Sequence, residues 1–161
     1  MAKQSKGGTA ALIELARAGV EFAAREFTHD GGDLGYGLAA ASALGVEPAR
    51  VFKTLIALAD GRPAVAVVPV DRQLSLKLFA SALAAKRAEI AGPADAERLT
   101  GYVVGGISPF GQKRKLPTVL DESAAAFGTI FVSGGRRGLD VEVAPAALVD
   151  LLGARLATIA S

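Results

Sequence analysis

Lys53 and Thr54 interrupt an otherwise apolar segment, residues 51–59. In a β-strand, Lys53 shares one face with Val51 and Leu55. A cation within an apolar stripe costs free energy unless an anionic group meets it. Lys53 is therefore either a ligand for a phosphate or carboxylate, an electrostatic catalyst, or a lysine whose stem packs on an edge strand while its ammonium group reaches water.

Two consecutive glycines mark a second candidate site, which has the sequence Gly105-Gly106-Ile107-Ser108-Pro109. Glycines let the backbone approach a ligand closely and direct N–H groups at it. Such N–H groups can bind a phosphate or the oxyanion that develops during ester cleavage. The alternative is a β-turn whose exit is set by the proline.

Two basic clusters follow this site in the sequence, one formed by Lys113, Arg114 and Lys115 and the other by Arg136 and Arg137. Each cluster stands beside glycines. Basic side chains can neutralise RNA phosphates, but a charge run is also typical of a solvated surface.

Motifs for several other chemistries are incomplete. A spacing close to a Walker A loop begins at Gly106, but Gln112 holds the position that needs lysine, which excludes an ATPase of that type. His29 is the only histidine and there is no cysteine, so neither a His-rich nor a Cys-based metal site is expected. Ser108 and Ser133 lie outside the G-x-S-x-G pattern of a nucleophile elbow.

The composition indicates one folded domain over residues 1–161. Hydrophobic residues make up 51% and charged residues 21%, with a net charge of +2, which excludes general disorder. A nucleic-acid surface would have to be local at this charge. Tryptophan is absent and aromatic residues are 6%, which disfavours a stacking platform for bases.

The first residues and the apolar runs indicate a cytoplasmic protein. Residues 1–8 are polar and glycine-rich and are expected to be frayed. Glu14 and Arg17 interrupt what would be the apolar core of a signal peptide. No apolar run approaches the about 18–20 residues that span a bilayer, so no membrane contact is expected.

Hydrophobic periodicity and turn residues position these candidates on alternating helices and strands. Helices are predicted over 9–18, 38–44, from Ser75 onward, over 93–99 and over 145–152, with one helical turn at 121–126. Strands are predicted over 20–27, 51–59, 64–70, 102–104, 118–120, 129–132 and 139–143. The elements predict a mixed α/β (α+β) fold with a largely antiparallel, barrel-like central sheet flanked by helices.

Four segments in a fixed order resemble the YbaK/EbsC family, the free-standing relatives of the insertion domain of bacterial prolyl-tRNA synthetase. The resemblance extends from about Thr9 to Ile159. It rests on residues 51–55 (VFKTL), 74–77 (LSLK), 100–113 (TGYVVGGISPFGQK) and 132–139 (VSGGRRGL), of which the long third segment is the most specific.

The resemblance implies an aminoacyl-tRNA deacylase that acts in trans on Cys-tRNA(Pro), with Cys-tRNA(Cys) a second substrate of some members. It implies that Lys53 binds near the 3′-terminal adenosine and the ester, and that Gly105 to Pro109 contact the aminoacyl group. In cysteine-specific members the substrate's own thiol attacks the ester, so the reaction resembles a lyase-type cyclisation. No metal or cofactor is implied, and prolyl-tRNA synthetase is an expected partner besides the aminoacylated end of tRNA.

The resemblance extends the candidate site and leaves two alternatives open. We expect catalytic roles for Lys53, Gly105 and Gly106. Substrate contacts are expected from Phe27, Thr54, Ile107, Ser108 and Pro109, and tRNA contacts from Lys113, Arg114, Lys115, Arg136 and Arg137. Phe27 departs from the family, whose members often carry tyrosine there. The alternatives are a non-catalytic module that binds the tRNA end or a synthetase, and a deacylase for another small amino acid such as alanine.

Overall fold

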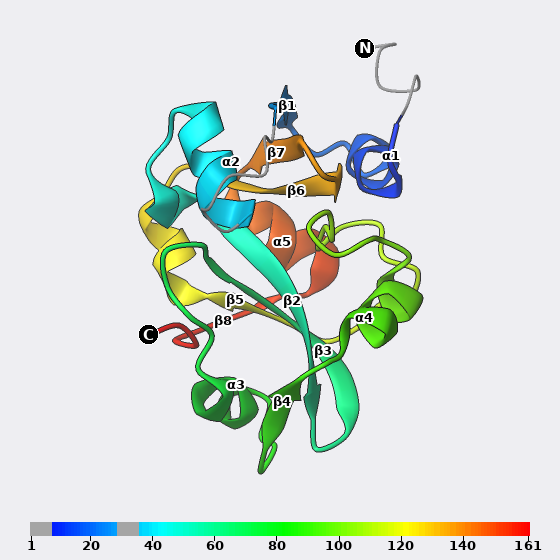
Figure 1. Ribbon diagram of the computed structural model, residues 1–161, viewed down its shortest axis with the longest axis vertical. Helices are drawn as coiled ribbons and strands as arrows, with labels where there is room; N and C mark the ends of the chain where they lie inside the picture. The colour runs from blue at the N-terminus through cyan, green and yellow to red at the C-terminus, as the bar shows by residue number, and fades with distance from the viewer. Residues whose placement is uncertain (1–7, 29–35) are drawn as a thin grey trace.

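The computed structural model describes residues 8–28 and 36–161. Two β-sheets form the centre of the fold and the helices lie around them (Figure 1). The described part contains no helix that is both long and apolar enough to cross a membrane. His29 and most of the segment expected to be frayed lie outside the described residues.

The larger sheet has five strands, and the two strands predicted over 51–59 and 64–70 form its central hairpin. In spatial order its strands are β4 (Ala88–Ile90), β2 (Phe52–Ala59), β3 (Arg62–Pro69), β5 (Thr118–Asp121) and β8 (Arg155–Ala157). β2 pairs antiparallel with β3 and β4, whereas β3–β5 and β5–β8 are parallel.

The turn between β2 and β3 follows from its sequence. Asp60 and Gly61 both have positive φ, at 50° and 80°, as a two-residue hairpin turn requires. The Asp60 carboxylate also accepts hydrogen bonds from the backbone N–H groups of Lys86 and Arg87, which ties the turn to the segment that leads into β4. This contact fixes the outer end of the strand that carries Lys53.

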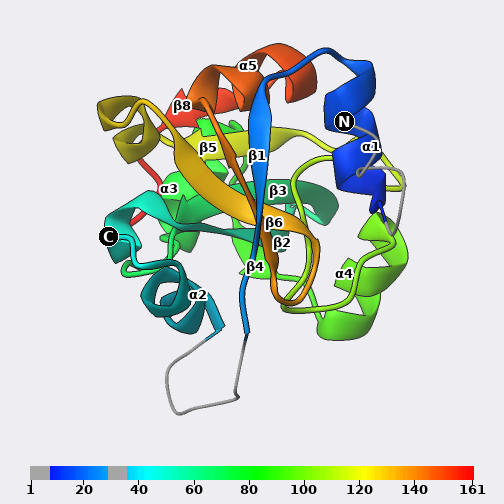
Figure 2. The same ribbon diagram turned by 90° about the horizontal axis from the view of Figure 1, so that it is seen from above.

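The smaller sheet has three antiparallel strands. Their spatial order is β1 (Phe22–Glu26), β7 (Leu139–Val143) and β6 (Ile130–Arg136). Seen from above, β1 and β6 cross over the five-stranded sheet (Figure 2). The pairing of β6 with β7 shifts between Ser133 and Arg136, so this end of the hairpin is irregular.

The two sheets meet where β2 begins. Val51 and Phe131 form a single parallel bridge between them. The main core fills the space between the sheets, with Phe52, Ile56, Val65 and Val67 from one and Ile130, Val132, Leu139 and Val141 from the other. The mixed α/β fold class is confirmed, and four of the six strand pairings are antiparallel. The sheets are not closed into a barrel.

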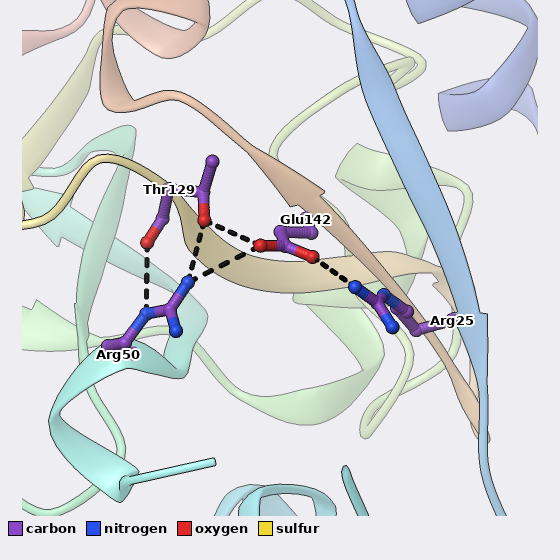
Figure 3. Close-up of polar contacts among 4 residues, drawn as sticks. All are labelled: Arg25, Arg50, Thr129 and Glu142. Atoms are coloured by element: carbon purple, nitrogen blue, oxygen red, sulfur yellow. Dashed lines mark hydrogen bonds and ion pairs between the residues drawn. The ribbon is translucent and has the colours of Figure 1, made fainter.

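A polar network reinforces this junction (Figure 3). The Glu142 carboxylate on β7 accepts hydrogen bonds from Arg25 at 2.6 Å and from the Thr129 hydroxyl at 2.7 Å. Arg50, just before β2, donates to the Thr129 hydroxyl at 2.6 Å and lies 5.0 Å from the ring centre of Phe131. The hydrogen bonds from Thr129 and Arg25 hold the pKa of Glu142 below its ordinary value.

Local signals explain the helices. Thr9 and Ser75 accept hydrogen bonds from the N–H groups of Leu12 and Leu78, as N-cap residues do. Gly101 and Gly153 end two helices in the left-handed conformation. The α-helices are α1 (Ala10–Arg17), α2 (Tyr36–Leu44), α3 (Leu76–Ala82), α4 (Pro93–Thr100) and α5 (Pro145–Leu152), with 3₁₀ turns η2 (Pro48–Arg50) and η3 (Glu122–Ala126).

The strand predicted over residues 102–104 is wrong. This segment belongs to a long loop between α4 and β5. The Tyr102 hydroxyl donates to the Phe110 carbonyl at 2.6 Å, and the Gly106 N–H donates to the Val103 carbonyl at 2.9 Å. These contacts fold the segment back on itself, although its residue types favour a strand. The short strands β4 and β8 were not predicted.

Asp121, at the end of β5, secures the C-terminal segment. It is almost fully buried. Its carboxylate accepts hydrogen bonds from the N–H groups of Ser123, Ile159 and Ala160. Burial by itself raises the pKa of Asp121, but these hydrogen bonds outweigh burial and hold the pKa below its ordinary value. The folded protein therefore stabilises the ionised form.

Removing the Asp121 charge should reveal how much the ionised carboxylate contributes to the free energy of unfolding. We expect Asp121→Asn to lower the free energy of unfolding by about 1–3 kcal/mol at pH 7, because buried donors lose an ionised acceptor. A group whose pKa falls on folding contributes stability above its unfolded pKa, about 3.9 for aspartate, and loses it as pH falls through the folded pKa. Urea unfolding at pH 7 and pH 3 measures the difference, with the exposed Asp71→Asn as control. An equal deficit at both pH values contradicts this account.

Candidate functional site

A cavity of about 490 Å³ opens where the two sheets meet. Its floor is formed by Val51 and by the first part of β2, from Phe52 to Ile56. The rest of the wall is mainly apolar and includes Leu38 and Ala40 of α2, Ile90 of β4, and Pro93 and Ala96 of α4. The cavity therefore offers an apolar surface with few polar groups, which is typical of a small-molecule site.

Lys53 is one of the residues of this floor, and its side chain is half-buried. Burial lowers the pKa of its ammonium group, since the charged form loses hydration. No described residue forms a hydrogen bond or an ion pair with this group. A partly desolvated cation in the cavity lining favours a functional role for Lys53, as ligand or electrostatic catalyst, over a lysine whose ammonium group only reaches water.

Thr54 is the next residue of the floor. Its hydroxyl oxygen is buried, and no described residue forms a hydrogen bond with it. Buried hydroxyl groups in native proteins almost always have partners. The predicted substrate contact of Thr54 stays a prediction, because this oxygen is not exposed to the cavity.

Ser133 on β6 and Asp140 on β7 add two polar groups from the smaller sheet. They are directly paired across the two strands. Asp140 is only 7% exposed, and burial raises the pKa of its carboxyl group to about 7. The Ser133 hydroxyl accepts a hydrogen bond from the Gly135 N–H at 3.1 Å. The cavity thus combines a cation and a carboxyl group that can gain or lose a proton near neutral pH.

The segment from Gly105 to Pro109, which we call the glycine loop, forms the remaining wall together with the residue before it. Val104, Gly105 and Ile107 line the cavity. Gly105 has φ of +92°, in the region that favours glycine. A Cβ atom on Gly106 would lie 2.8–2.9 Å from the backbone of Arg136 and Arg137, so only glycine lets the loop pack on the β6–β7 hairpin.

Three other predicted residues of this loop lie behind the lining. Gly106, Ser108 and Pro109 are buried and are not part of the cavity wall. The Ser108 hydroxyl accepts a hydrogen bond from the Phe110 N–H at 3.1 Å, and its carbonyl accepts one from the Gln112 side chain at 2.9 Å. These contacts shape the loop, and the predicted substrate contacts of these residues stay predictions.

The remaining predicted residues fall into two groups. Phe27, Arg136 and Arg137 line a separate hollow beside the β6–β7 turn. Lys113, Arg114 and Lys115 are exposed on the long loop before β5. Their predicted contacts with substrate and tRNA are not tested by this arrangement.

Sequence reasoning missed Asp140 and set Ser133 aside. Leu139, Val141 and Val143 alternate with Asp140 and Glu142, which is typical of a strand with one solvated face. The structure instead buries Asp140 against the cavity. In the described ranges, no group of three or more histidine, aspartate or glutamate side chains is arranged to hold a metal ion.

Comparison with known proteins identifies the family of this chain. The family described as the aminoacyl-tRNA editing domain matches residues 38–151. This range contains Lys53, the glycine loop and Asp140, but not Phe27. The chain belongs to the aminoacyl-tRNA editing domain family.

Individual relatives carry editing activities in their names. Over 120 residues the chain is 42% identical to an Enterococcus faecalis protein named as a Cys-tRNA(Pro)/Cys-tRNA(Cys) deacylase, EbsC, covering 74% of this chain and 73% of that protein. It is 31% identical to an Escherichia coli protein named a multifunctional Ser/Thr-tRNA deacylase, over 75% of this chain and 72% of that one. A Streptococcus suis proline–tRNA ligase matches 50% of this chain at 32% identity, over 13% of the ligase.

Solved structures agree on the fold. A crystal structure described as a trans-editing enzyme for prolyl-tRNA synthetase has a TM-score of 0.80, with 23% identity, over 99% of this chain and 96% of that chain. At this identity the likeness establishes the architecture alone. The mixed fold and the editing-protein resemblance inferred from the sequence are both confirmed.

Burial of Asp140 predicts a pH-dependent stability. Because its pKa rises on folding, the native state retains a proton that the unfolded state loses, so stability falls as pH rises from about 4 to about 7. We expect Asp140→Asn to match the wild type near pH 4 and to be more stable at pH 8, with the gap growing by up to about 1.4 kcal/mol per pH unit. Urea unfolding at both pH values measures it.

The exposed Asp150→Asn on α5 is the matched control. This substitution removes an exposed carboxylate, so the stability of the variant should follow that of the wild type at both pH values. A difference between Asp140→Asn and the wild type that does not change with pH would show that Asp140 is not held protonated near neutrality.

Proposed function

We propose that the protein removes a wrongly attached amino acid from tRNA in trans, in the cytoplasm, and that Cys-tRNA(Pro) is its main substrate. One observation carries the proposal: the cavity of a member of the editing family contains a half-buried lysine with no partner among the described residues, facing into the same space as a glycine loop. The name of the 42%-identical relative supports the choice of amino acid.

In this proposal Lys53 binds the negative charge at the end of the tRNA. The terminal phosphate and the ester carbonyl are the acceptors that an ammonium group in this wall would meet. Its cost of burial in the free protein is offset when the anionic tRNA end enters the cavity. Thr54 follows on the opposite face of the same strand, so its buried, unpaired hydroxyl would have to turn towards the substrate to add a second contact.

The oxyanion donors come from the glycine loop. The Gly106 N–H is already bonded to Val103, whereas no described residue accepts a hydrogen bond from the N–H groups of Gly105 and Ile107. The proposal therefore gives the donor role to Gly105 and Ile107. Gly106 keeps an essential but different role, because it lets the loop approach the hairpin.

The substrate supplies the nucleophile. The cysteine thiol loses its proton, its sulphur bonds to the carbonyl carbon, the ester C–O bond breaks, and the ribose 3′ oxygen takes up a proton. The products are tRNA with a free 3′ hydroxyl and a cyclic thioester of cysteine. Asp140, whose burial raises its pKa to about 7, can exchange the proton on the cavity side. The protein then contributes the orientation of the thiol towards the carbonyl carbon and the stabilisation of the developing charge.

The exposed cluster Lys113–Lys115 is proposed to bind phosphates of the tRNA where the strand extends out of the cavity. Arg136 bonds to Glu26 and Arg137 to Val104, so their capacity for phosphate is partly occupied. Prolyl-tRNA synthetase is the proposed partner that delivers the charged tRNA, since proline–tRNA ligases contain a segment related to this chain.

A second candidate function is deacylation of Ser-tRNA or Thr-tRNA. The name of the 31%-identical E. coli relative favours it. A cavity of about 490 Å³ would admit any of these side chains, and one methylene changes selectivity by only about 1–3 kcal/mol. The two candidates differ in the group that attacks the ester.

Removal of the Lys53 charge tests the site. We expect Lys53→Met to lower the single-turnover rate of Cys-tRNA(Pro) deacylation by about 100-fold, the scale of losing one electrostatic contact in an active site. Its melting temperature should equal or exceed that of the wild type, because the folded protein disfavours this charge. Lys77→Met on α3, which removes an exposed charge, is the control and should keep both rate and stability. A near-normal rate in Lys53→Met would show that the assigned role is wrong.

The nucleophile is tested by changing the amino acid on one tRNA. We expect Cys-tRNA(Pro) to react far faster than Ser-tRNA(Pro), since a hydroxyl is much less acidic than a thiol of pKa about 8.5. His29→Ala should keep the cysteine rate within a few-fold. Single-turnover measurement of the amino acid released from each tRNA gives the rate ratio and the effect of His29→Ala. Equal rates for the two amino acids, or a collapse in His29→Ala, would mean that the protein activates water.

A further inference from the structure

The peptide units around Val104 are held from two sides. The Val104 N–H donates to the Glu97 carboxylate of α4 at 2.8 Å. The Val104 carbonyl accepts two hydrogen bonds from the Arg137 guanidinium, from Nε at 3.0 Å and from Nη2 at 2.8 Å. Glu97 and Arg137 thus fix both polar groups of one residue in the cavity wall. We call this pair the Val104 clamp.

Apolar packing does not hold this part of the loop. Val103 and Val104 are 53% and 40% exposed, respectively. A loop whose large side chains are in water gains little stability from burial, so its position depends on polar contacts. Among those contacts, the Val104 clamp links the loop to two separate elements, α4 and the turn between β6 and β7.

The clamp acts directly on the proposed oxyanion donor. Gly105 follows Val104, and a Cβ atom there would lie 2.8 Å from Arg137 Nε. The guanidinium therefore packs on the glycine as well as bonding to the residue before it. A shift of the Val104 carbonyl would rotate the peptide that carries the Gly105 N–H.

We propose that Glu97 and Arg137 are positioning residues for the editing reaction, which act by fixing the peptide that presents the Gly105 N–H to the ester carbonyl. The inference rests on the proposed function. It assigns Arg137 a role other than the tRNA contact expected from its charge. Arginine suits this role because its planar fork can give two bonds to one carbonyl, which the single ammonium group of lysine cannot reproduce.

Loss of Arg137 would have different kinetic effects if it positions the loop or if it binds a tRNA phosphate. A positioning residue affects the transition state, so its loss lowers kcat. A phosphate ligand affects binding of the whole tRNA, so its loss raises KM and reduces the salt dependence by about 0.7–0.9 in the log–log slope. Steady-state deacylation of Cys-tRNA(Pro) at several salt concentrations separates the two.

The experiment compares Arg137→Ala, Arg137→Lys and Glu97→Ala with the wild type. We expect kcat to fall by about 10–100-fold, the range associated with misplacement by about 1 Å, with KM and salt slope unchanged. Glu97→Gln should retain most activity, because its amide oxygen can still accept from the Val104 N–H. Arg98→Ala is the matched control: it removes a positive charge next to Glu97 on α4, and its partner is Asp95. Its kcat should be unchanged.

Two kinetic results would overturn the proposal. One is a higher KM and a smaller salt slope at normal kcat in Arg137→Ala, which would make Arg137 a phosphate ligand. The other is unchanged kinetics in both Arg137→Ala and Glu97→Ala.

Hydrogen–deuterium exchange gives a readout that does not require activity. Residues 103–107 should exchange faster in Arg137→Ala than in Arg98→Ala, and unchanged exchange would overturn the clamp. A wild-type protein that deacylates no charged tRNA would refute the proposed function, and the exchange result would still decide whether the clamp exists.

Discussion

A lysine held partly out of water, without a protein anion to meet it in the described structure, is the constraint on which the site depends. Burial lowers the pKa of Lys53, so the charged form is disfavoured in the free protein, and an incoming anionic group would offset this effect. The fold makes this possible by placing Lys53 on β2, near the bridge between Val51 and Phe131 that joins the sheets. The network of Arg25, Arg50 and Glu142 with Thr129 secures that junction (Figure 3).

The cavity wall opposite β2 is built from elements that are remote in sequence. The glycine loop packs on the β6–β7 hairpin because Gly106 leaves no side chain between them. The same hairpin supplies Asp140 and the arginine that bonds to Val104. Loop, hairpin and carboxyl group are therefore packed together and line the same mainly apolar cavity as the lysine. Such an arrangement suits a reaction in which the substrate brings its own nucleophile and the protein supplies orientation and charge.

Local chemistry made much of the fold predictable. Thr9 and Ser75 define helix starts, and Asp60-Gly61 defines the hairpin turn, because each acts through neighbours in the chain. Lys53 was singled out by local reasoning, from alternation in one strand, and its role stays a prediction. The strand expected at Tyr102 failed because a contact with the Phe110 carbonyl overrides residue preference. Asp140 was missed because its burial depends on elements remote in sequence that line the same cavity, and no pattern within Leu139–Val143 records that.

The central claim is that the aminoacyl end of tRNA occupies the cavity between the sheets, beside Lys53 and Gly105. The most direct test is a crystal structure with a non-hydrolysable analogue, adenosine carrying cysteine through a 3′ amide bond. The account predicts the cysteinyl group inside the cavity, its carbonyl oxygen within hydrogen-bond distance of the Gly105 or Ile107 N–H, and Lys53 against the carbonyl or the adenosine. An analogue bound on another surface, with the cavity unchanged, would contradict it.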